Sequence, residues 1–193
     1  MPPVTQALIV ANVAVFLLQS VGGGALVEWF ALWPIVSGPS DVPSFQPWQL
    51  VTYGFLHGNL THLLFNMFGL YMFGSDIERL FGPRYFTSYY FACVVSAALC
   101  QLVVTGWIGA PAAPTVGASG GIYGLLLAFG MYFPRRMVVL MFPPIPMQAR
   151  VFVFVFAALE LFLGVTGTAA GVAHFAHLGG MLGGWLMIRK RRT

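Results

Sequence analysis

A serine set among small residues is the first candidate for chemistry in this chain. Ser119 lies in the segment 117–121 (GASGG), between a proline-containing loop and an apolar stretch. Small neighbours allow another backbone to come close and leave the serine hydroxyl accessible. A serine in such a place can act as a nucleophile when a base takes its proton. The alternative is close helix packing, because Gly120 and Gly124 form a Gly-xxx-Gly pair.

The candidate base is His177, near the C-terminus. An imidazole hydrogen-bonded to Ser119 can accept the serine proton and later give it to a leaving amine. Gly180 and Gly184 follow His177 and give its helix face a bare stripe, so two glycine-rich helices can approach closely. Tyr123, one turn after Ser119, can pack on the imidazole ring. The alternatives are a histidine satisfied by a backbone carbonyl and an ordinary core tyrosine.

His62 and Asn66 are the candidate hydrogen-bond donors for a developing negative charge. They are four residues apart, so they share one face of a helix. Both side chains can donate toward the same point, which suits an oxyanion hole. The alternative is hydrogen bonding between helices, which polar residues commonly provide in membranes.

No acidic partner for His177 has an obvious place in the sequence, so we expect a Ser-His dyad rather than a triad. Glu160, in the middle of an apolar segment, is either a proton-linked group or a neutral carboxylic acid paired within the bundle, and we favour the second. The five acidic residues are Glu28, Asp41, Asp76, Glu78 and Glu160.

A metal site or transporter built on histidines is a further possibility. The spacings of His57, His62, His174 and His177 would permit metal ligands, but no carboxylate or thiolate is expected on that side. We therefore expect neither a metal nor a cofactor.

The composition predicts an integral membrane protein. Of the 193 residues, 59% are hydrophobic and only 7% are charged, whereas a soluble domain carries about 25% charged residues. Nothing in the chain separates two units, so we expect one domain over residues 1–193. Six stretches have the length and apolarity expected of membrane helices. They cover about residues 4–21, 59–80, 85–105, 119–133, 150–165 and 172–188.

The basic residues predict the orientation of these spans. Nine Lys and Arg residues fall in the second-to-third and fourth-to-fifth connections and in the C-terminal tail. With six spans these places share one side, which the positive-inside rule makes cytoplasmic, together with both termini. The net charge of +4 is therefore explained by topology, and we expect no nucleic-acid partner. The long connection at 25–47 is expected to lie at the bilayer surface.

The predicted fourth helix places Ser119 below the membrane surface. Its roughly 15 residues span about 22 Å, against about 30 Å of hydrocarbon. If its basic end lies at the cytoplasmic interface, its start is sunken from the other side. A helix N-terminus also presents free N–H groups to a developing oxyanion.

These motifs together resemble the rhomboid intramembrane serine proteases. Gly117 and Ser119 match the family's Gly-x-Ser-Gly, and Ala176-His177 with the two following glycines matches its Ala-His-x-x-Gly-x-x-x-Gly. His62-x-x-x-Asn66 is similar to the second-helix motif that lines the oxyanion hole. Further matches are Tyr123 and the pair Glu78 and Gly82, whereas Gln49 stands where some members have arginine.

The resemblance implies an all-α, six-transmembrane-helix, rhomboid-like bundle with Ser119 as nucleophile and His177, not His174, as base. Its activity would be cleavage of single-span membrane proteins near the non-cytoplasmic face, through an acyl-enzyme. Gly117, His62, Asn66 and Tyr123 would support the reaction. The alternatives are a catalytically silent scaffold of the same fold and the histidine-based metal site. The expected location is a bacterial plasma (inner) membrane; the oligomeric state is not predicted.

Overall fold

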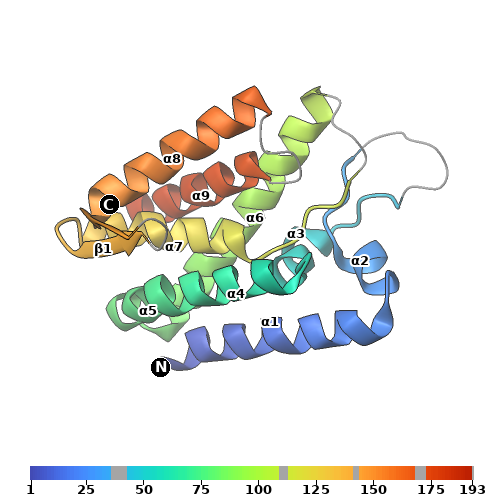
Figure 1. Cartoon of the computed structure of the whole chain (residues 1–193), viewed down its shortest axis with the longest axis horizontal. Helices are drawn as coiled ribbons and strands as arrows, with labels where there is room; N and C mark the ends of the chain where they lie inside the picture. Colours follow the sequence, from blue (N-terminus) through green and yellow to red (C-terminus); the bar gives the residue numbers. More distant parts are fainter. Residues whose placement is uncertain (36–42, 109–112, 141–143, 168–172, 193) are drawn as a thin grey trace.

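A computed structural model describes residues 1–35, 43–108, 113–140, 144–167 and 173–192. The fold is a bundle of helices with one two-stranded hairpin (Figure 1). The helices and turns are α1 (Pro3–Gly22), α2 (Ala25–Phe30), α3 (Gln49–Thr52), η1 (Tyr53–Phe55), α4 (Leu60–Gly69), η2 (Leu70–Gly74), α5 (Ser75–Phe81), α6 (Pro83–Ile108), α7 (Ser119–Tyr132), α8 (Ala149–Thr166) and α9 (His174–Arg192). The strands are β1 (Met137–Leu140) and β2 (Ile145–Gln148).

Three of the helices are long and apolar enough to cross a membrane, within the described residues. They are α1, most of α6 and α8, and α7 is a shorter apolar helix. Six helical segments coincide with the six stretches singled out in the sequence, with ends that differ by a few residues. The crossing of a bilayer by all six remains a prediction.

The second predicted span is built from three consecutive pieces. Asn59 caps α4, because its side chain accepts a hydrogen bond from His62 N at 2.8 Å. The chain then passes through the π-helical turn η2 and continues as α5. Gly82 ends α5 with φ of 77°, a left-handed conformation that favours glycine.

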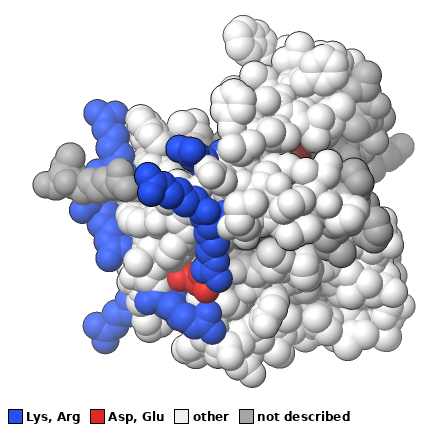
Figure 2. Space-filling view, turned by 60° about the vertical axis from the view of Figure 1, so that its left-hand side comes forward, with Lys and Arg blue, Asp and Glu red and all other residues white. Residues whose placement is uncertain are grey.

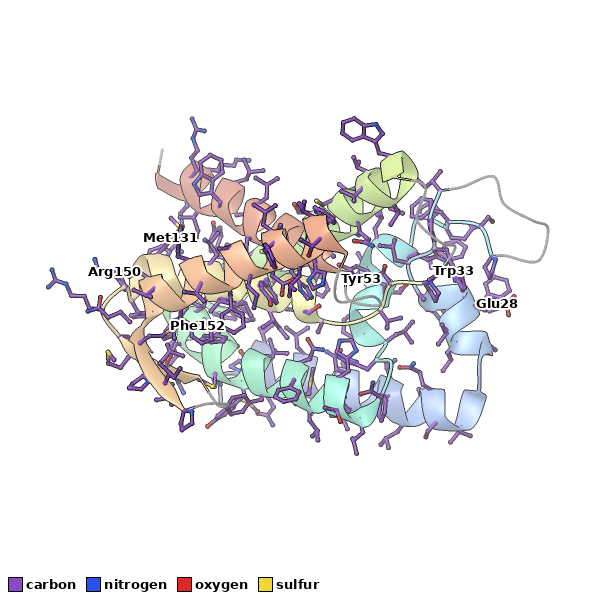
Figure 3. The ribbon with its side chains drawn as sticks, turned by 45° about the horizontal axis from the view of Figure 1, so that its top comes forward. Glu28, Trp33, Tyr53, Met131, Arg150 and Phe152 are labelled. Atoms are coloured by element: carbon purple, nitrogen blue, oxygen red, sulfur yellow. The ribbon has the colours of Figure 1, made fainter. Side chains whose placement is uncertain are left out.

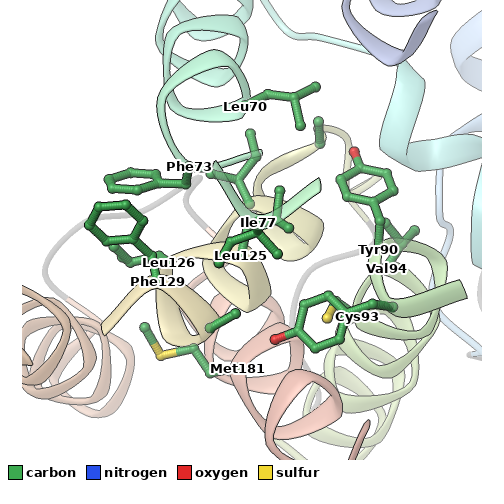
Figure 4. Close-up of a cluster of buried hydrophobic side chains, with 14 of the residues drawn as sticks. Leu70, Phe73, Ile77, Tyr90, Cys93, Val94, Leu125, Leu126, Phe129 and Met181 are labelled. Atoms are coloured by element: carbon green, nitrogen blue, oxygen red, sulfur yellow. The ribbon is translucent and has the colours of Figure 1, made fainter. Parts of the chain in front are cut away.

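Helix α7 occupies the middle of the bundle. Figure 1 shows it between α4–α5 on one side and α8–α9 on the other. The close-up in Figure 4 shows Leu125, Leu126 and Phe129 of α7 among side chains from η2, α5, α6 and α9. The start of α7, which carries Ser119, is thus positioned by apolar contacts on several sides.

Glycines bring α7, α6 and α9 into unusually close contact. A Cβ atom placed on Gly180 would lie 1.9 Å from the carbonyl oxygen of Gly120, and one on Gly124 would lie 2.2 Å from Cys93 Sγ. No side chain fits at such distances. The glycine stripe therefore fixes the separation between the helix that carries Ser119 and the helix that carries His177.

A buried acid ties α1 to α5. Glu78 is 2% exposed, and its carboxylate accepts hydrogen bonds from Val4 N, Thr5 N and Thr5 Oγ1 at 2.7–2.9 Å. A negative charge at a helix N-terminus is favourable, because the free N–H groups and the helix dipole both point toward it.

The connections contain structure that the sequence did not predict. The stretch expected to lie on the bilayer leads from the short helix α2 to the short helix α3, and Gln49 Nε2 of α3 donates a hydrogen bond to Trp29 O of α2 at 3.3 Å. The proline-containing segment after α7 forms an antiparallel hairpin in which Met137 pairs with Gln148. Asp41, in the same long connection as Trp33, lies outside the described residues.

Both termini lie at one end of the bundle (Figure 1). Basic side chains gather on that end, while the remainder of the visible face carries almost no charge (Figure 2). Arg150 extends from this end, and Glu28 and Trp33 lie at the opposite end (Figure 3). The arrangement in space agrees with the charge pattern along the sequence.

Candidate active site

Ser119 and His177 meet at the start of α7. The Oγ atom of Ser119 lies 2.8 Å from Nε2 of His177, although the residues are 58 positions apart in the chain. This is an ordinary hydrogen-bond distance. The serine hydroxyl can donate to Nε2 only if that nitrogen carries a lone pair, which is the state that a general base requires.

Tyr123 fixes the plane of the His177 ring. The two rings are stacked, with centroids 4.2 Å apart and planes inclined by 4°. The packing expected for this tyrosine is therefore present in the structure, and its contribution to activity remains a prediction.

Glu160 is the main feature of the site that the sequence analysis missed. Its Oε1 lies 3.0 Å from Nδ1 of His177, so an acidic group does stand behind the histidine. The oxygen lies off the direction of a well-aligned Nδ1–H hydrogen bond, so the contact is a close approach of a carboxylate oxygen to the ring nitrogen. The expectation that His177 lacks an acidic neighbour is wrong, because α8 brings an acid from mid-helix to this point.

His174 belongs to the same cluster. Its Nδ1 lies 2.5 Å from Oε2 of Glu160, while Tyr123 donates its hydroxyl proton to Oε1. Glu160 and His174 are 7% and 6% exposed. An acidic residue in the middle of an apolar helix was the signal available in the sequence, but the sequence alone did not indicate which neighbours it meets.

His62 borders the space beside the serine. A Cβ atom placed on Gly117 would lie 2.8 Å from Cε1 and Nε2 of His62 and 3.7 Å from Ser119 Oγ. The ring edge and the hydroxyl therefore face the same small space. Gly117 has φ of 125°, a conformation that favours glycine, and any side chain there would displace the ring.

Asn66 lies one turn after His62 and is 6% exposed. Its Nδ2 donates to the carbonyl oxygen of His62 at 2.9 Å. An amide group has two N–H donors, so one remains available for a further acceptor. Its role in an oxyanion hole stays a prediction.

Tyr53 supports the turn that precedes Ser119 and was not singled out from the sequence. Its carbonyl oxygen accepts from Gly117 N at 3.0 Å, and its hydroxyl donates to Val94 O at 2.8 Å. The side chain is 1% exposed and lies between the long connection and the centre of the bundle (Figure 3). Nothing in the sequence around Tyr53 indicated that this tyrosine would support the turn before Ser119.

His57 lies beside the site without entering it. Its ring packs edge-on against that of His62, with centroids 5.1 Å apart. Burial, helped by the neighbouring His62, lowers the pKa of His57 to about 4, because a charged ring loses its hydration there. His57 is therefore neutral near pH 7.

The cluster of Glu160, His174 and His177 has the composition of a metal site. One ligand atom from each lies within 4.8 Å of the others, so the expectation that no carboxylate joins these histidines is wrong. Around a tetrahedral Zn²⁺, ligand atoms would stand roughly 3.3 Å apart. The 2.5 Å separation of His174 Nδ1 and Glu160 Oε2 fits a hydrogen bond instead.

Comparison with known proteins finds relatives in bacteria and in organelles. "RHOMBOID-like protein 12, mitochondrial" of Arabidopsis thaliana is 27% identical over 206 residues, which cover 98% of this chain and 59% of that protein. "Rhomboid protease GlpG" of Pectobacterium atrosepticum is 25% identical over 188 residues, covering 96% and 61%. "Rhomboid protein 1, mitochondrial" of Saccharomyces cerevisiae is 31% identical over 153 residues, covering 72% and 40%. This chain thus spans 40–61% of the length of these relatives.

The family assignment comes from a match to the Rhomboid domain. It extends over residues 44–192 and so includes α3 to α9, with Ser119, His177 and Glu160. Together with the apolar helices, this match identifies an integral membrane protein. The chain belongs to the rhomboid family.

Proposed function

We propose that this chain is an intramembrane serine endopeptidase. The observation that carries the proposal is the 2.8 Å approach of Ser119 Oγ to His177 Nε2, made beneath the stacked ring of Tyr123. A nucleophile in contact with its base, and a base held by a third group, is the arrangement that covalent catalysis requires. Membership of a family that includes serine proteases supports this reading.

The reaction proceeds in two halves. His177 Nε2 takes the hydroxyl proton while Ser119 Oγ attacks the peptide carbonyl carbon, and the carbonyl oxygen becomes an oxyanion. The imidazolium then gives its proton to the peptide nitrogen as the C–N bond breaks, leaving an acyl-enzyme. Water attacks the acyl carbon in the second half and gives its proton to Nε2. Collapse of this second intermediate returns the proton to Ser119 Oγ and releases the carboxylic acid.

Donors around Ser119 would hold the oxyanion. His62 faces the space beside the hydroxyl, and Asn66 has an amide proton to spare. The first-turn N–H groups of α7 also lack partners within their own helix. Such donors act mainly on the transition state, because the charge is fully developed only there.

The substrate proposed is a single-span membrane protein. Rhomboid proteases act on transmembrane substrates in the lipid bilayer, and the site here lies in a helix bundle with an apolar exterior. Ser119 begins a helix of 14 residues, about 21 Å long, so its hydroxyl would lie inside the bilayer near the end opposite the basic residues. Cleavage is therefore expected near the non-cytoplasmic end of the substrate helix.

A serine-directed phosphonofluoridate probe and a model single-span substrate test the proposal. Ser119→Ala should lose both labelling and cleavage, and His177→Ala should lose cleavage, each with an unchanged thermal midpoint. Ser88→Ala is the matched control, because its exposed hydroxyl only donates to Arg84 O within its own helix. Cleavage that survives in Ser119→Ala would overturn the proposal.

Measurements on the same purified protein distinguish the protease from the two alternatives, the silent scaffold and the metal-dependent function. A scaffold predicts no labelling of Ser119 by the probe and no cleavage. A metal-dependent function predicts a stoichiometric bound metal and loss of activity with a chelator. The metal measurement is included because Glu160, His174 and His177 form a cluster of possible metal ligands.

The proposed location is a bacterial plasma membrane, with the basic end of the bundle in the cytoplasm. Relatives named as mitochondrial and chloroplastic place family members in other membranes as well. The charge asymmetry is what supports an orientation, and fractionation of the source cells tests the location.

A further inference from the structure

The buried acid Glu160 takes no direct part in the two halves of the proposed reaction. Its carboxylate meets three side chains from two other helices: Tyr123 of α7, and His174 and His177 of α9. These are the polar groups that face it among the described residues. Glu160 thus connects the proposed base to the rest of the bundle, and any role for it in catalysis rests on the function proposed above.

The protons at the site define what Glu160 must do. Nε2 of His177 faces Ser119 Oγ at 2.8 Å, so it must be the unprotonated nitrogen when the serine is attacked. In a neutral imidazole the other nitrogen then carries the proton. That nitrogen, Nδ1, lies 3.0 Å from Glu160 Oε1. A negatively charged oxygen this close attracts a proton on Nδ1 even without a well-aligned hydrogen bond, so it favours the tautomer that catalysis needs.

All three neighbours can act as donors to Glu160. The Tyr123 hydroxyl donates to Oε1, and His174 Nδ1 lies at hydrogen-bond distance from Oε2. If Glu160 were neutral, its own acidic proton would face other hydrogen-bond donors and would lack an acceptor. An ionised carboxylate only accepts hydrogen bonds, so it matches these neighbours. The surroundings therefore favour the carboxylate, in contrast to the neutral acid expected from the sequence.

The charge also matters after the proton moves. When His177 has taken the serine proton it is an imidazolium, and the carboxylate beside Nδ1 interacts with it directly. Such an attraction is strong where water is excluded, and both oxygens of Glu160 are held in place by Tyr123 and His174. The carboxylate needs no reorganisation at the moment of reaction.

We propose that Glu160 is a positioning residue for His177: held by Tyr123 and His174, it selects the Nδ1–H tautomer and stabilises the imidazolium during acyl transfer. Ser119, His177 and Glu160 then form a chain of interacting groups in which only the first two touch the substrate. His174, whose ring holds Glu160 in place, contributes through Glu160.

Two substitutions at Glu160 separate its charge from its hydrogen bonds. Glu160→Gln removes the charge but keeps an acceptor oxygen, and Glu160→Leu removes both. We expect kcat to fall by about 10²-fold or more in Glu160→Leu and by an intermediate factor in Glu160→Gln, with little change in KM. His174→Ala should lower kcat less than Glu160→Leu does.

A spectroscopic readout does not depend on turnover. The ¹⁵N shifts of the His177 ring, identified by subtracting the spectrum of His177→Ala, should report the Nδ1–H tautomer in the unmodified protein. In Glu160→Leu they should report a mixture of tautomers. A structural role alone would move the thermal midpoint and leave this spectrum unchanged.

The matched control is Glu78, a second acid that is buried among the residues the structure describes. Glu78→Gln and Glu78→Leu remove a carboxylate that only caps α1, so they should lower the thermal midpoint and leave kcat and the His177 spectrum as they were. If Glu160→Leu kept both its kcat and its His177 tautomer while Ser119→Ala was inactive, this inference would be overturned. The proposed protease function would still stand. Cleavage that survives in Ser119→Ala would instead overturn the proposed protease function.

Discussion

The direction of hydrogen bonding around His62 supports a donor role for this residue. Gly58 N–H donates to its Nδ1 at 3.4 Å, so in the neutral ring Nε2 carries the proton. That nitrogen faces the space above Gly117, beside Ser119 Oγ. The ring is thus set to donate where the oxyanion would form.

His62→Ala and Asn66→Ala test the oxyanion hole. In other enzymes, loss of one oxyanion-hole donor lowers the rate by about 10²–10³. We expect each substitution here to lower kcat at least about tenfold, with a small change in KM. Residual activity would come from the remaining donors and the first-turn N–H groups of α7. Steady-state cleavage in liposomes, beside a thermal scan of each variant, provides the measurement.

Asn12→Ala is the control for Asn66. Asn12 is a buried amide whose Nδ2 donates to Leu8 O, four residues back, at 2.7 Å, just as Asn66 donates to His62 O. The two alanine variants lose the same kind of bond within a helix. A lower thermal midpoint with normal kcat in both would assign Asn66 to helix packing and remove it from the oxyanion hole.

The pH dependence of stability is expected to include a contribution from His57. Its pKa is about 4 in the folded protein and about 6.5 in an unfolded chain. Between these values the unfolded chain binds a proton that the folded protein does not, so stability falls as the pH falls through this window.

Thermal midpoints measured from about pH 7 to about pH 4.5 test this contribution. The midpoint of His57→Gln should fall less over this range than that of the unmodified protein. Equal slopes would show that His57 titrates alike in both states.

At the scale of helices, periodic apolar segments and their end signals predicted most of the fold. The stretch from Ser119 was expected to end near residue 133, and α7 ends at Tyr132. The turn η2 was not predicted, because Leu70–Gly74 contains no residue that marks a π-helix. The hairpin was missed as well, since its prolines indicated only a break.

The candidate site was predictable only where a local motif carries it. Ser119, His177 and Tyr123 lie in short glycine-bearing patterns on helices that the glycines bring together. The position of Glu160 depends instead on how α8 packs against α7 and α9. Contact between helices distant in sequence is a tertiary property, and no spacing along α8 reveals it.

The glycine contact between α7 and α9 should be intolerant of even one methyl group. In Gly180→Ala the new Cβ would meet Gly120 O, 1.9 Å away in the present packing, so the helices must separate. We expect a loss of about 1–3 kcal/mol in stability, and lower kcat because the distance from Ser119 to His177 increases. Thermal scans and cleavage assays measure both effects.

Gly106→Ala is the control for Gly180. A Cβ at Gly106 in α6 has no atom within 4 Å, so the helix should gain about 0.5–1 kcal/mol with normal kcat. Equal midpoints in the two variants would contradict the close contact.

At the scale of the whole molecule, charge divides the bundle into two ends. The basic residues flank the ends of α5, α6, α7, α8 and α9 that lie on the side of both termini (Figures 1 and 2). Asp76 is the acid found there in contact with them, 2.9 Å from Arg136 and 3.2 Å from Arg79. Exposed pairs of this kind add at most about 1 kcal/mol, so the asymmetry bears on orientation more than on stability.

Cysteine labelling tests the proposed six-span topology. Glu28 and Arg150 lie at opposite ends of the molecule (Figure 3), with three of the proposed spans between them. In a chain with Cys93 and Cys100 changed to alanine, Glu28→Cys should react with a membrane-impermeant maleimide on intact cells. Arg150→Cys should react only after permeabilisation, because the positive-inside rule places its end in the cytoplasm.

The cysteine-free chain is the blank, and its thermal midpoint checks that it folds. Labelling of both positions in intact cells would mean that an even number of spans separates them, and the six-span arrangement would have to be abandoned.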